Sequence, residues 1–288
     1  MLTVSHLTKQ IDSTMIYENA SFTLPAGTIT ALIGRNGAGK TTLLKTLVGA
    51  LEPSRGKVEW NNQSIHDVPA ARKHLFLVPD SIGVYRQMTL GSLIEFYQAF
   101  YPNFERTYIE NYCRSSNLDR GRKVTALSKG QAQLFLLQLA FATNAPVLLL
   151  DEPTDGLDRI NKRNYLQQLV SLLTERQTAV LIASHQLEEL DTLADRVMTI
   201  EQHLVKEPKT LDDAKASMQK WQVVYETVPE LKHHDIHVLT QTGRVVTLLV
   251  LSDAGKLYLE KTNPLLKDAL PVQMEDYFLG TFGGNRHD

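Results

Sequence analysis

Residues 34–41 read GRNGAGKT, which fits the pattern G-x-x-x-x-G-K-[ST] of a loop that binds nucleotide phosphates. The apolar run at residues 29–33 predicts a buried strand before the loop. Apolar residues between Thr42 and Leu51 share one helical face after it. Backbone N–H groups of the loop and the positive end of the helix would then meet at one place, where phosphate oxygens can bind. The sequence therefore predicts a nucleoside triphosphate site.

Lys40 and Thr41 supply the two side chains that such a site requires. Lys40 would reach the β and γ phosphates as a point charge, and the Thr41 hydroxyl would be a ligand of Mg²⁺. The alternative is a glycine-rich turn in which the Lys-Thr pair is incidental. The residues expected to contact the nucleotide are Gly34, Asn36, Gly37, Ala38, Gly39, Lys40, Thr41 and Thr42.

Two carboxylates follow the aliphatic run at residues 147–150. Asp151 and Glu152 would lie at the carboxyl edge of a parallel sheet, where open α/β folds bind ligands. Asp151 would hold Mg²⁺, directly or through water, and Glu152 would orient or deprotonate the water that attacks the γ-phosphate. Taken alone, the pair fits a solvated acidic turn equally well.

A second anion site is predicted where Leu127-Ser128-Lys129-Gly130-Gln131 opens a helix. A serine, a glycine and a helix N-terminus together favour bound anions. A chain with one phosphate loop needs no second phosphate site of its own. The second site is explained if it serves the nucleotide of a partner chain.

With these motifs, the sequence resembles the ATP-binding subunits of ABC transporters over about residues 2–205. The resemblance rests on five motifs in order: the Walker A loop at 34–41, the signature at 127–131, the Walker B run at 147–151 with Glu152, the D-loop Gly156-Leu157-Asp158, and the switch histidine His185. It implies a head-to-tail dimer that sandwiches two ATP molecules, each between the Walker A loop of one subunit and the signature of the other.

The resemblance also assigns roles to residues outside the phosphate loop. His185 would contact the γ-phosphate and sense hydrolysis, so the expected catalytic residues are Glu152, His185 and Lys40. The signature and the D-loop add the nucleotide-binding residues Ser128, Gly130, Gln131 and Asp158.

Four positions depart from the usual family pattern. Ile11 takes the place of the aromatic residue that stacks on adenine, which predicts weaker stacking. Asp80 stands where glutamine is usual and is the third expected metal residue, beside Thr41 and Asp151. Lys129 replaces a signature glycine and would add a cation near a partner's γ-phosphate. Asp80 and Lys129 are similar to exporters of the drug and peptide type, and Leu134 replaces a common basic residue.

The composition limits the choice of partners and compartment. A net charge of -2 and a pI near 6.5 give no reason to expect a nucleic-acid partner. The single cysteine, Cys113, cannot form a disulfide within the chain and favours a reducing compartment. The longest apolar stretches are too short for a membrane helix, so we expect no membrane span in this chain.

We expect an α/β fold, a P-loop NTPase of the ABC type, from the alternation of strand and helix patterns. The predicted ATPase domain covers 1–205, with a β-rich start and a helical insertion at about 85–143. Helical patterns run from about Leu90 to Leu139 with breaks near Pro102 and Gly121. Residues 206–288 are predicted to form a small α+β accessory domain.

Two weaker signals lie outside these motifs. His233, His234 and His237 lie near Asp235 and fit a solvated loop better than a metal site, because no other residue with ligand spacing supports them. Aromatic residues recur at near-helical spacing after residue 80, and most are expected in the core. Some of them could line the groove where, by the resemblance, a membrane subunit docks; they are Phe96, Tyr97, Phe100, Tyr101 and Phe104.

The sequence favours the ATP-hydrolysing subunit of an exporter, bound at the cytoplasmic face of the membrane. Its partners would be separately encoded transmembrane permease subunits and a second ATPase subunit of like or unlike sequence. The alternative is a soluble ABC-type ATPase that acts on ribosomes or DNA. Against it, the chain has one Walker A loop, whereas the translation-factor branch has two. The sequence also has no coiled-coil insertion and no excess of basic over acidic residues.

Overall fold

The computed structural model describes residues 1–283 and divides the chain into two compact units. The N-terminal unit contains residues 1–185 and 193–208. The C-terminal unit contains residues 186–192 and the chain from 209 onward. The observed division differs from the expected boundary at 205/206 mainly at 186–192, which group with the C-terminal unit.

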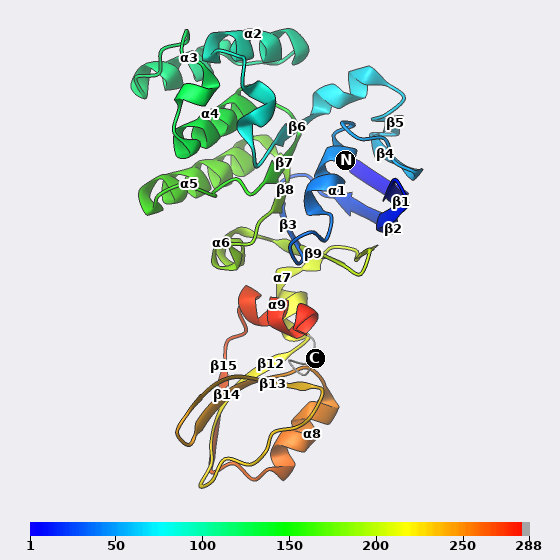
Figure 1. Ribbon diagram of the computed structural model, residues 1–288, viewed down its shortest axis with the longest axis vertical. Helices are drawn as coiled ribbons and strands as arrows, with labels where there is room; N and C mark the ends of the chain where they lie inside the picture. Colours follow the sequence, from blue (N-terminus) through cyan, green and yellow to red (C-terminus); the bar gives the residue numbers. More distant parts are fainter. Residues whose placement is uncertain (284–288) are drawn as a thin grey trace. The chain divides into compact units, whose positions relative to one another are not determined.

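The N-terminal unit starts with antiparallel strands and then alternates strands with helices (Figure 1). Its strands are β1 (Leu2–Ile11), β2 (Thr14–Leu24), β3 (Ile29–Ile33), β4 (Arg55–Trp60), β5 (Gln63–Ser64), β6 (Leu75–Val78), β7 (Val147–Asp151), β8 (Ala179–Ala183), β9 (Arg196–Glu201) and β10 (Leu204–Val205). Its helices are α1 (Lys40–Leu47), α2 (Leu90–Phe100), α3 (Arg106–Ser115), α4 (Lys129–Ala142) and α5 (Arg159–Arg176), with 3-10 turns η1 (Pro69–His74), η2 (Ile82–Tyr85) and η3 (Val124–Ala126).

The parallel part of the sheet has the strand order β9-β3-β8-β7-β6. Each neighbouring pair in this series is parallel. Every residue of β3, β7 and β8 is buried, as expected for strands covered on both faces. The predicted strand, helix and strand crossover through α5 is confirmed. Because the strands are parallel, their carboxyl ends lie at one edge of the sheet.

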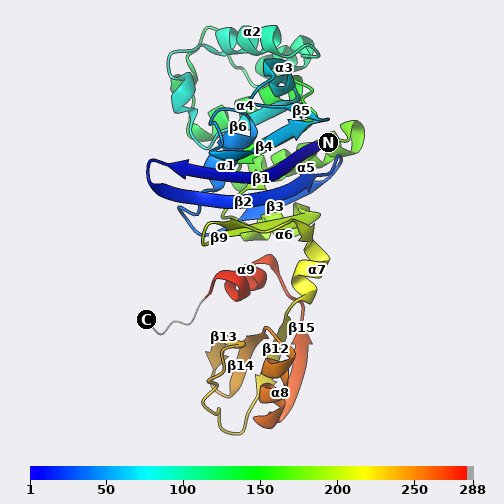
Figure 2. The same cartoon turned by 90° about the vertical axis from the view of Figure 1, so that its right-hand side faces the viewer.

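The antiparallel part of the unit is built on the long β1–β2 hairpin (Figure 2). Strand β1 also pairs with β4, and β10 joins β2 to β9, so the strand order continues as β5-β4-β1-β2-β10-β9. One hydrophobic cluster packs α1 between this hairpin and the parallel strands, with Leu24, Leu44 and Leu149 among its buried members. The expected β-rich N-terminal subdomain is thereby confirmed.

The helical insertion lies between β6 and β7 and consists mainly of α2, α3 and α4 (Figure 1). The expected breaks near Pro102 and Gly121 are confirmed, since both residues lie between helices. Two of the helices begin with a capping box, formed by Thr89 with Ser92 at α2 and by Ser128 with Gln131 at α4. These caps fix where each helix starts.

The C-terminal unit contains a four-stranded antiparallel sheet with the order β13-β14-β12-β15. The side chain of Leu259, on α8, packs with buried residues of this sheet, including Val223 and Leu248. The predicted strands near 221–225 and 244–251 are present. The elements of this unit are α6 (Leu187–Leu193, of which Leu193 falls in the N-terminal unit), β11 (Lys209–Thr210), α7 (Leu211–Ala216), β12 (Gln219–Val224), β13 (Ile236–Thr242), β14 (Val245–Val250), α8 (Asp253–Lys261), β15 (Leu266–Leu270) and α9 (Met274–Phe282).

Candidate functional site

The phosphate loop joins β3 to α1 through backbone that requires glycine at two points. A Cβ atom at Gly34 would lie 2.6 Å from the carbonyl oxygen of Ile200, and one at Gly39 would lie 2.7 Å from Cγ2 of Ile16. Gly39 also has φ 103°, in the left-handed region, and is the N-cap of α1. The loop therefore packs tightly and ends at a helix start whose first N–H groups have no partner within the helix.

A cavity of about 340 Å³ lies against this loop. Its wall combines the loop with three carboxylates at or just after the ends of two neighbouring strands, β6 and β7. The lining residues are Asn36, Gly37, Ala38, Gly39, Lys40, Thr41, Thr42, Asp80, Asp151 and Glu152. The cavity therefore brings together the loop and the carboxylates that the sequence assigned to one nucleotide and its Mg²⁺.

The sheet explains why residues far apart in sequence meet here. Strand β3 runs into the phosphate loop, and β6 ends two residues before Asp80. Strand β7 ends at Asp151, so Glu152 follows it directly. Strand β8 ends two residues before His185. All four strands are parallel neighbours, and their carboxyl ends place these groups at one edge, as open α/β folds do.

Lys40 is held by the loop itself. Its Nζ atom donates hydrogen bonds to the carbonyl oxygens of Gly34 at 2.7 Å and Arg35 at 3.2 Å. Burial lowers the pKa of the Lys40 ammonium, while the charges of Glu152 and Asp151 oppose that shift. A cation that is partly desolvated and already bonded to the loop is suited to an anionic ligand, because phosphate oxygens would replace the water that it has lost.

Asp151 is a buried carboxylate with an exposed fraction of 3%. Burial raises the pKa of its carboxyl group, a hydrogen bond from Thr41 opposes the shift, and the negative charges of Asp80 and Glu152 add to it. These residues fit a magnesium ion, because Mg²⁺ prefers oxygen ligands and its charge would compensate the acidic groups. The candidate ligands are therefore the three that the sequence proposed.

Glu152 and His185 contact each other. The Nδ1 atom of His185 lies 2.8 Å from Oε2 of Glu152, and the backbone N–H of His185 donates to the same oxygen at 3.1 Å. The backbone N–H of Glu152 donates to the carbonyl oxygen of Ala183 at 2.8 Å. Glu152 has φ 45°, a left-handed conformation that costs a residue with a Cβ atom about 1 kcal/mol. Strain held by such contacts is common at functional sites.

The signature and D-loop residues do not line this cavity. Ser128 and Gln131 bond to each other across the start of α4, with Gln131 N–H donating to Ser128 Oγ at 3.2 Å. Asp158 is the N-cap of α5 and accepts from the N–H of Asn161 at 2.9 Å. Gly130 lies close to the D-loop, because a Cβ atom there would lie 3.1 Å from the carbonyl oxygen of Gly156. Their predicted contacts with a nucleotide stay predictions.

Ile11 is the last residue of β1 and is 42% exposed. It does not belong to the cavity wall given above. In the β1–β2 hairpin, Ile16 lies against the phosphate loop, because a Cβ atom at Gly39 would lie 2.7 Å from its Cγ2 atom. The sequence pattern drew attention to Ile11 and missed Ile16, because the aliphatic side chain of Ile16 resembles any other strand residue.

Two further charged residues were missed by the sequence reasoning. Lys45 on α1 opposes the pKa rise of Asp151 through its positive charge. Asp155 forms an ion pair with Lys129 of the signature. The positions 129 and 155 have no periodic relation, so only the folded chain could reveal this pair.

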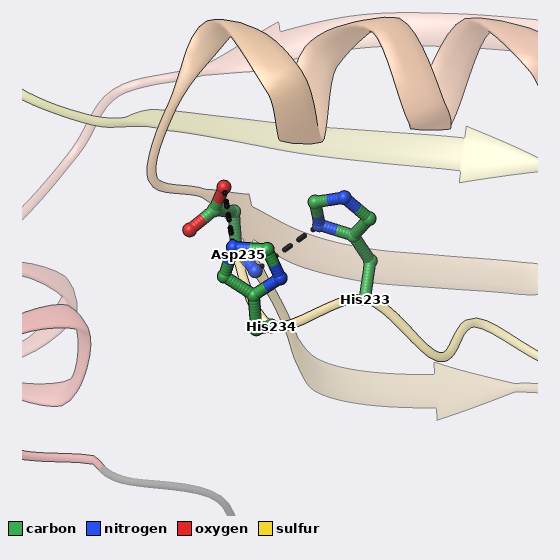
Figure 3. Close-up of side chains that lie close together, drawn as sticks. All are labelled: His233, His234 and Asp235. Atoms are coloured by element: carbon green, nitrogen blue, oxygen red, sulfur yellow. Dashed lines mark hydrogen bonds and ion pairs between the residues drawn. The ribbon is translucent and has the colours of Figure 1, made fainter.

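A small histidine cluster lies in the C-terminal unit (Figure 3). The ligand atoms of His233, His234 and Asp235 lie within 4.8 Å of one another. The two imidazole rings are stacked, however, with centroids 4.6 Å apart and planes at 19°. Lone pairs lie in the ring planes, so two stacked rings cannot direct nitrogens to one metal about 2.0 Å from each. The Nδ1 atom of His233 also accepts the N–H of Asp235.

The cluster therefore fits the solvated turn that the sequence favoured for His233 and His234. His237 differs, because it lies in strand β13. The expectation of a loop for all three histidines was wrong at this position.

The five aromatic residues that recur after residue 80 differ in how deeply they are buried. Tyr101 is buried and its hydroxyl donates to the carbonyl oxygen of Leu75 at 2.7 Å. Phe96 is 54% exposed and Phe100 is 37% exposed. The expectation that most of the five would be core residues was wrong, since Tyr97 and Phe104 are only partly buried. Exposed aromatic side chains remain on α2.

Within residues 1–283, no helix combines the length and apolar character that a membrane crossing requires.

Comparison with known proteins gives one consistent family. The ABC transporter family model matches residues 17–155. The ABC transporter ATP-binding protein YtrB of Bacillus subtilis (strain 168) is 30% identical over 290 residues, which cover 99% of each chain. The bacitracin transport ATP-binding protein BcrA of Bacillus licheniformis is 26% identical over 317 residues, with 99% of this chain and 98% of the relative covered. The zinc import ATP-binding protein ZnuC of Ruegeria sp. (strain TM1040) is 30% identical over 206 residues, covering 71% and 78%.

Solved structures agree. An ATP-binding subunit of an ABC transporter superposes with a TM-score of 0.69 at 26% identity, covering 75% of this chain and 92% of that one. The ATP-binding cassette MJ0796, in a dimeric post-hydrolysis state bound to ADP and Pi, superposes with a TM-score of 0.64 at 22% identity, covering 73% and 99%. The second likeness concerns the fold alone.

Proposed function

Because the chain belongs to the ATP-binding proteins of ABC transporters, whose cassettes bind and hydrolyse ATP, we propose that it drives export through membrane subunits on separate chains. ATP would close a head-to-tail dimer of like or unlike chains. Hydrolysis would reopen it, and this cycle would move the membrane partner.

The observation that supports this proposal best is the shared cavity at the carboxyl edge of the sheet. Lys40, Asp151 and Glu152 line it, and His185 contacts Glu152. In the proposed roles, Lys40 binds the β and γ phosphates and Glu152 orients or deprotonates the attacking water. Thr41, Asp151 and Asp80 would hold Mg²⁺, which when bound would neutralise charge on the phosphates.

The contacts of Glu152 support this role. His185 contacts one of its carboxylate oxygens through both the ring and the backbone N–H, which limits rotation of the side chain. A general base must be held within reach of the proton that it takes. His185 is therefore proposed to position Glu152 and to sense the γ-phosphate from the same place.

The direction of transport is proposed from one feature of the sequence. Asp80 and Lys129 depart from the common family pattern in the manner of drug and peptide exporters. This resemblance favours export over import.

The proposed docking surface for a membrane subunit is the exposed side of α2. Phe96 and Phe100 lie one helical turn apart, both are exposed, and aromatic side chains are enriched in protein interfaces. This surface would hold the chain at the cytoplasmic face of the membrane through its partner.

The proposal is tested by extracting the native protein from membranes with mild detergent. A Glu152→Gln variant with ATP should hold the closed dimer, and a polytopic membrane protein should co-purify in stoichiometric amount. Uptake into inverted vesicles that contain the complex then measures export directly. The Phe96→Ser variant should lose the membrane protein. Val170→Ser, which removes a 46% exposed aliphatic side chain from α5, should keep it.

Other outcomes would contradict the proposal. Recovery with ribosomes or DNA, and without a membrane protein, would favour the alternative function, a soluble ABC-type ATPase that acts on ribosomes or DNA. Substrate loss from inverted vesicles on adding ATP would reverse the direction of transport and leave the ATPase assignment intact. Equal loss of the partner in the Phe96 and Val170 variants would exclude the α2 surface.

A further inference from the structure

Lys129 and Asp155 form an ion pair between two motifs of the same chain. Lys129 is the first residue of α4, and Asp155 lies between β7 and α5, one residue before the D-loop. The Nζ atom of Lys129 donates to Oδ2 of Asp155. The signature and the D-loop are therefore joined by a direct charged contact within one subunit.

The aliphatic stem of Lys129 also packs on this loop. Gly156 has φ +80°, and a Cβ atom there would lie 3.0 Å from Cδ and 3.3 Å from Cγ of Lys129. A Cβ atom at Gly130 would lie 3.1 Å from the carbonyl oxygen of Gly156. The first turn of α4 thus covers the D-loop backbone closely, and the ammonium group continues that contact to Asp155.

Three carboxylates of its own chain act on Lys129. The hydrogen bond with Asp155 raises the pKa of Lys129 and lowers the pKa of Asp155. The negative charges of Asp80 and Glu152 further raise the pKa of Lys129. Lys129 therefore already has a carboxylate partner in its own chain, with two more carboxylates attracting it.

We propose that Lys129 is a positioning residue, which fixes the D-loop of its own subunit through Asp155, and that it does not bind the phosphates of a partner's nucleotide. This inference goes beyond the expectation drawn from the family pattern, in which Lys129 adds a cation near a γ-phosphate. It depends on ATP hydrolysis, which the family performs, and not on the direction of transport.

The test is a charge-reversal cycle in the full-length protein, measured as steady-state ATP hydrolysis. Lys129→Asp and Asp155→Lys should each lower kcat about tenfold and change KM for ATP less than about twofold, because each leaves two like charges in contact. The double variant restores an opposite pair and should recover kcat to within about threefold of wild type. Lys129→Arg should keep wild-type activity.

A matched control uses Lys57 and Glu59 on β4, an ion pair at 2.9 Å that is not part of the site and in which the side chain of Lys57 is 59% exposed and that of Glu59 18% exposed. Exchanging these two charges should leave kcat and KM unchanged. A neutral cycle of Lys129→Gln, Asp155→Asn and the double variant covers the case in which a reversed charge prevents folding. In that cycle the double variant should be no worse than either single variant.

A phosphate-binding role for Lys129 would give different kinetics. If Lys129 binds phosphate, Lys129→Gln raises KM for ATP at least about tenfold. Asp155→Asn then has little effect, and neither double variant recovers. Such data overturn the positioning role. A wild-type protein without ATPase activity would instead contradict the family activity, so the two failures are distinguishable.

Discussion

The imidazole Nδ1 of His185 lies 2.8 Å from Oε2 of Glu152, an oxygen that also accepts the backbone N–H of His185 at 3.1 Å. An ionised carboxylate only accepts hydrogen bonds, so Nδ1 carries the hydrogen in this contact. Glu152 in turn is anchored to β8 through its own N–H. Glu152, the expected base, and His185, the expected sensor, therefore form a hydrogen-bonded pair at the end of β8.

Changing either residue of this pair should slow hydrolysis strongly without preventing ATP binding. Glu152→Gln keeps the size of the side chain and removes the base, and His185→Ala removes the ring that holds it. We expect kcat to fall about 100-fold in each case. Phosphate release measures kcat, and calorimetry with ATP measures binding. The control is His234→Ala, which changes a 76% exposed side chain in the C-terminal unit. Normal turnover in Glu152→Gln would remove Glu152 from the catalytic residues.

ATP binding should weaken at high pH because of Lys40. Burial lowers the pKa of this ammonium below its ordinary value of 10.5, so Lys40 loses its charge at a lower pH than an exposed lysine. ATP affinity should therefore fall as pH rises through that lowered pKa. Lys40→Met should bind ATP more weakly by about 2 kcal/mol near neutral pH and should lose this pH dependence.

Calorimetric titration with ATP from pH 7 to 10 measures both effects. Lys73→Met, which neutralises an exposed lysine in η1, should bind like wild type at every pH. An unchanged pH profile in Lys40→Met would mean that another group controls ATP affinity.

Asp151→Asn should raise the stability of the ligand-free protein while abolishing hydrolysis. Burial raises the pKa of Asp151, so the folded chain binds this proton more tightly than the unfolded chain does. Its ionisation therefore costs stability as pH rises from 3.8 through the raised pKa, and the full cost is present above it. Near neutral pH the variant should gain about 1 kcal/mol.

Thermal unfolding without nucleotide, at several pH values, measures this gain. The difference between the variant and wild type should shrink as pH falls below the raised pKa, where Asp151 is protonated. Added Mg²⁺ and ATP should stabilise wild type more than the variant, because the variant keeps the phosphate loop and Lys40 but lacks one proposed metal ligand. A lower melting temperature for Asp151→Asn at neutral pH would contradict this account.

The edge of the sheet was predictable from sequence because its strands are fully buried and simple in pattern. The run at 147–150 is continuously aliphatic, and the run at 29–33 contains one polar residue, Thr30. The phosphate loop directly follows the first strand, and Asp151 and Glu152 directly follow the aliphatic run of the second. Local pattern and motif then agree, so the loop and both carboxylates could be placed without a structure.

Other features depended on tertiary contacts that spacing does not report. Strand β13 mixes polar and apolar residues, with Val238 45% exposed, so its sequence did not favour a strand over a loop. Phe96 is hydrophobic but exposed, since only part of α2 faces the core. The Lys129–Asp155 pair joins two surface turns whose distance in sequence has no periodicity.

Ile11→Tyr should tighten ATP binding if Ile11 stands at the adenine. A tyrosine ring would stack on the base, which is worth about 1 kcal/mol. KM for ATP should then fall about fivefold with little change for a triphosphate without a base. Ile160→Tyr adds the same ring at a 74% exposed position on α5 and should leave KM unchanged. Equal KM values in both variants would contradict the placement of adenine near Ile11.

Asp276 connects α9 to the sheet of the C-terminal unit. Its carboxylate lies 3.0 Å from Nζ of Lys220 on β12 and accepts the N–H of Gln273 at 2.8 Å. Both partners are largely buried, with exposed fractions of 17% for the Lys220 side chain and 6% for that of Asp276. Asp276→Ala would leave a buried ammonium without its carboxylate and should destabilise this unit by roughly 3 kcal/mol.

Urea unfolding in a Trp60→Phe background isolates this effect, because Trp221 on β12 then reports on the C-terminal unit. The exposed neighbour Glu275 provides the control, and Glu275→Ala should shift the midpoint little. The double variant Lys220→Met/Asp276→Leu replaces both charges with apolar groups and should recover most of the lost stability, because no buried charge then lacks a partner. If Asp276→Ala and Glu275→Ala unfold at the same urea concentration, the pair does not anchor α9.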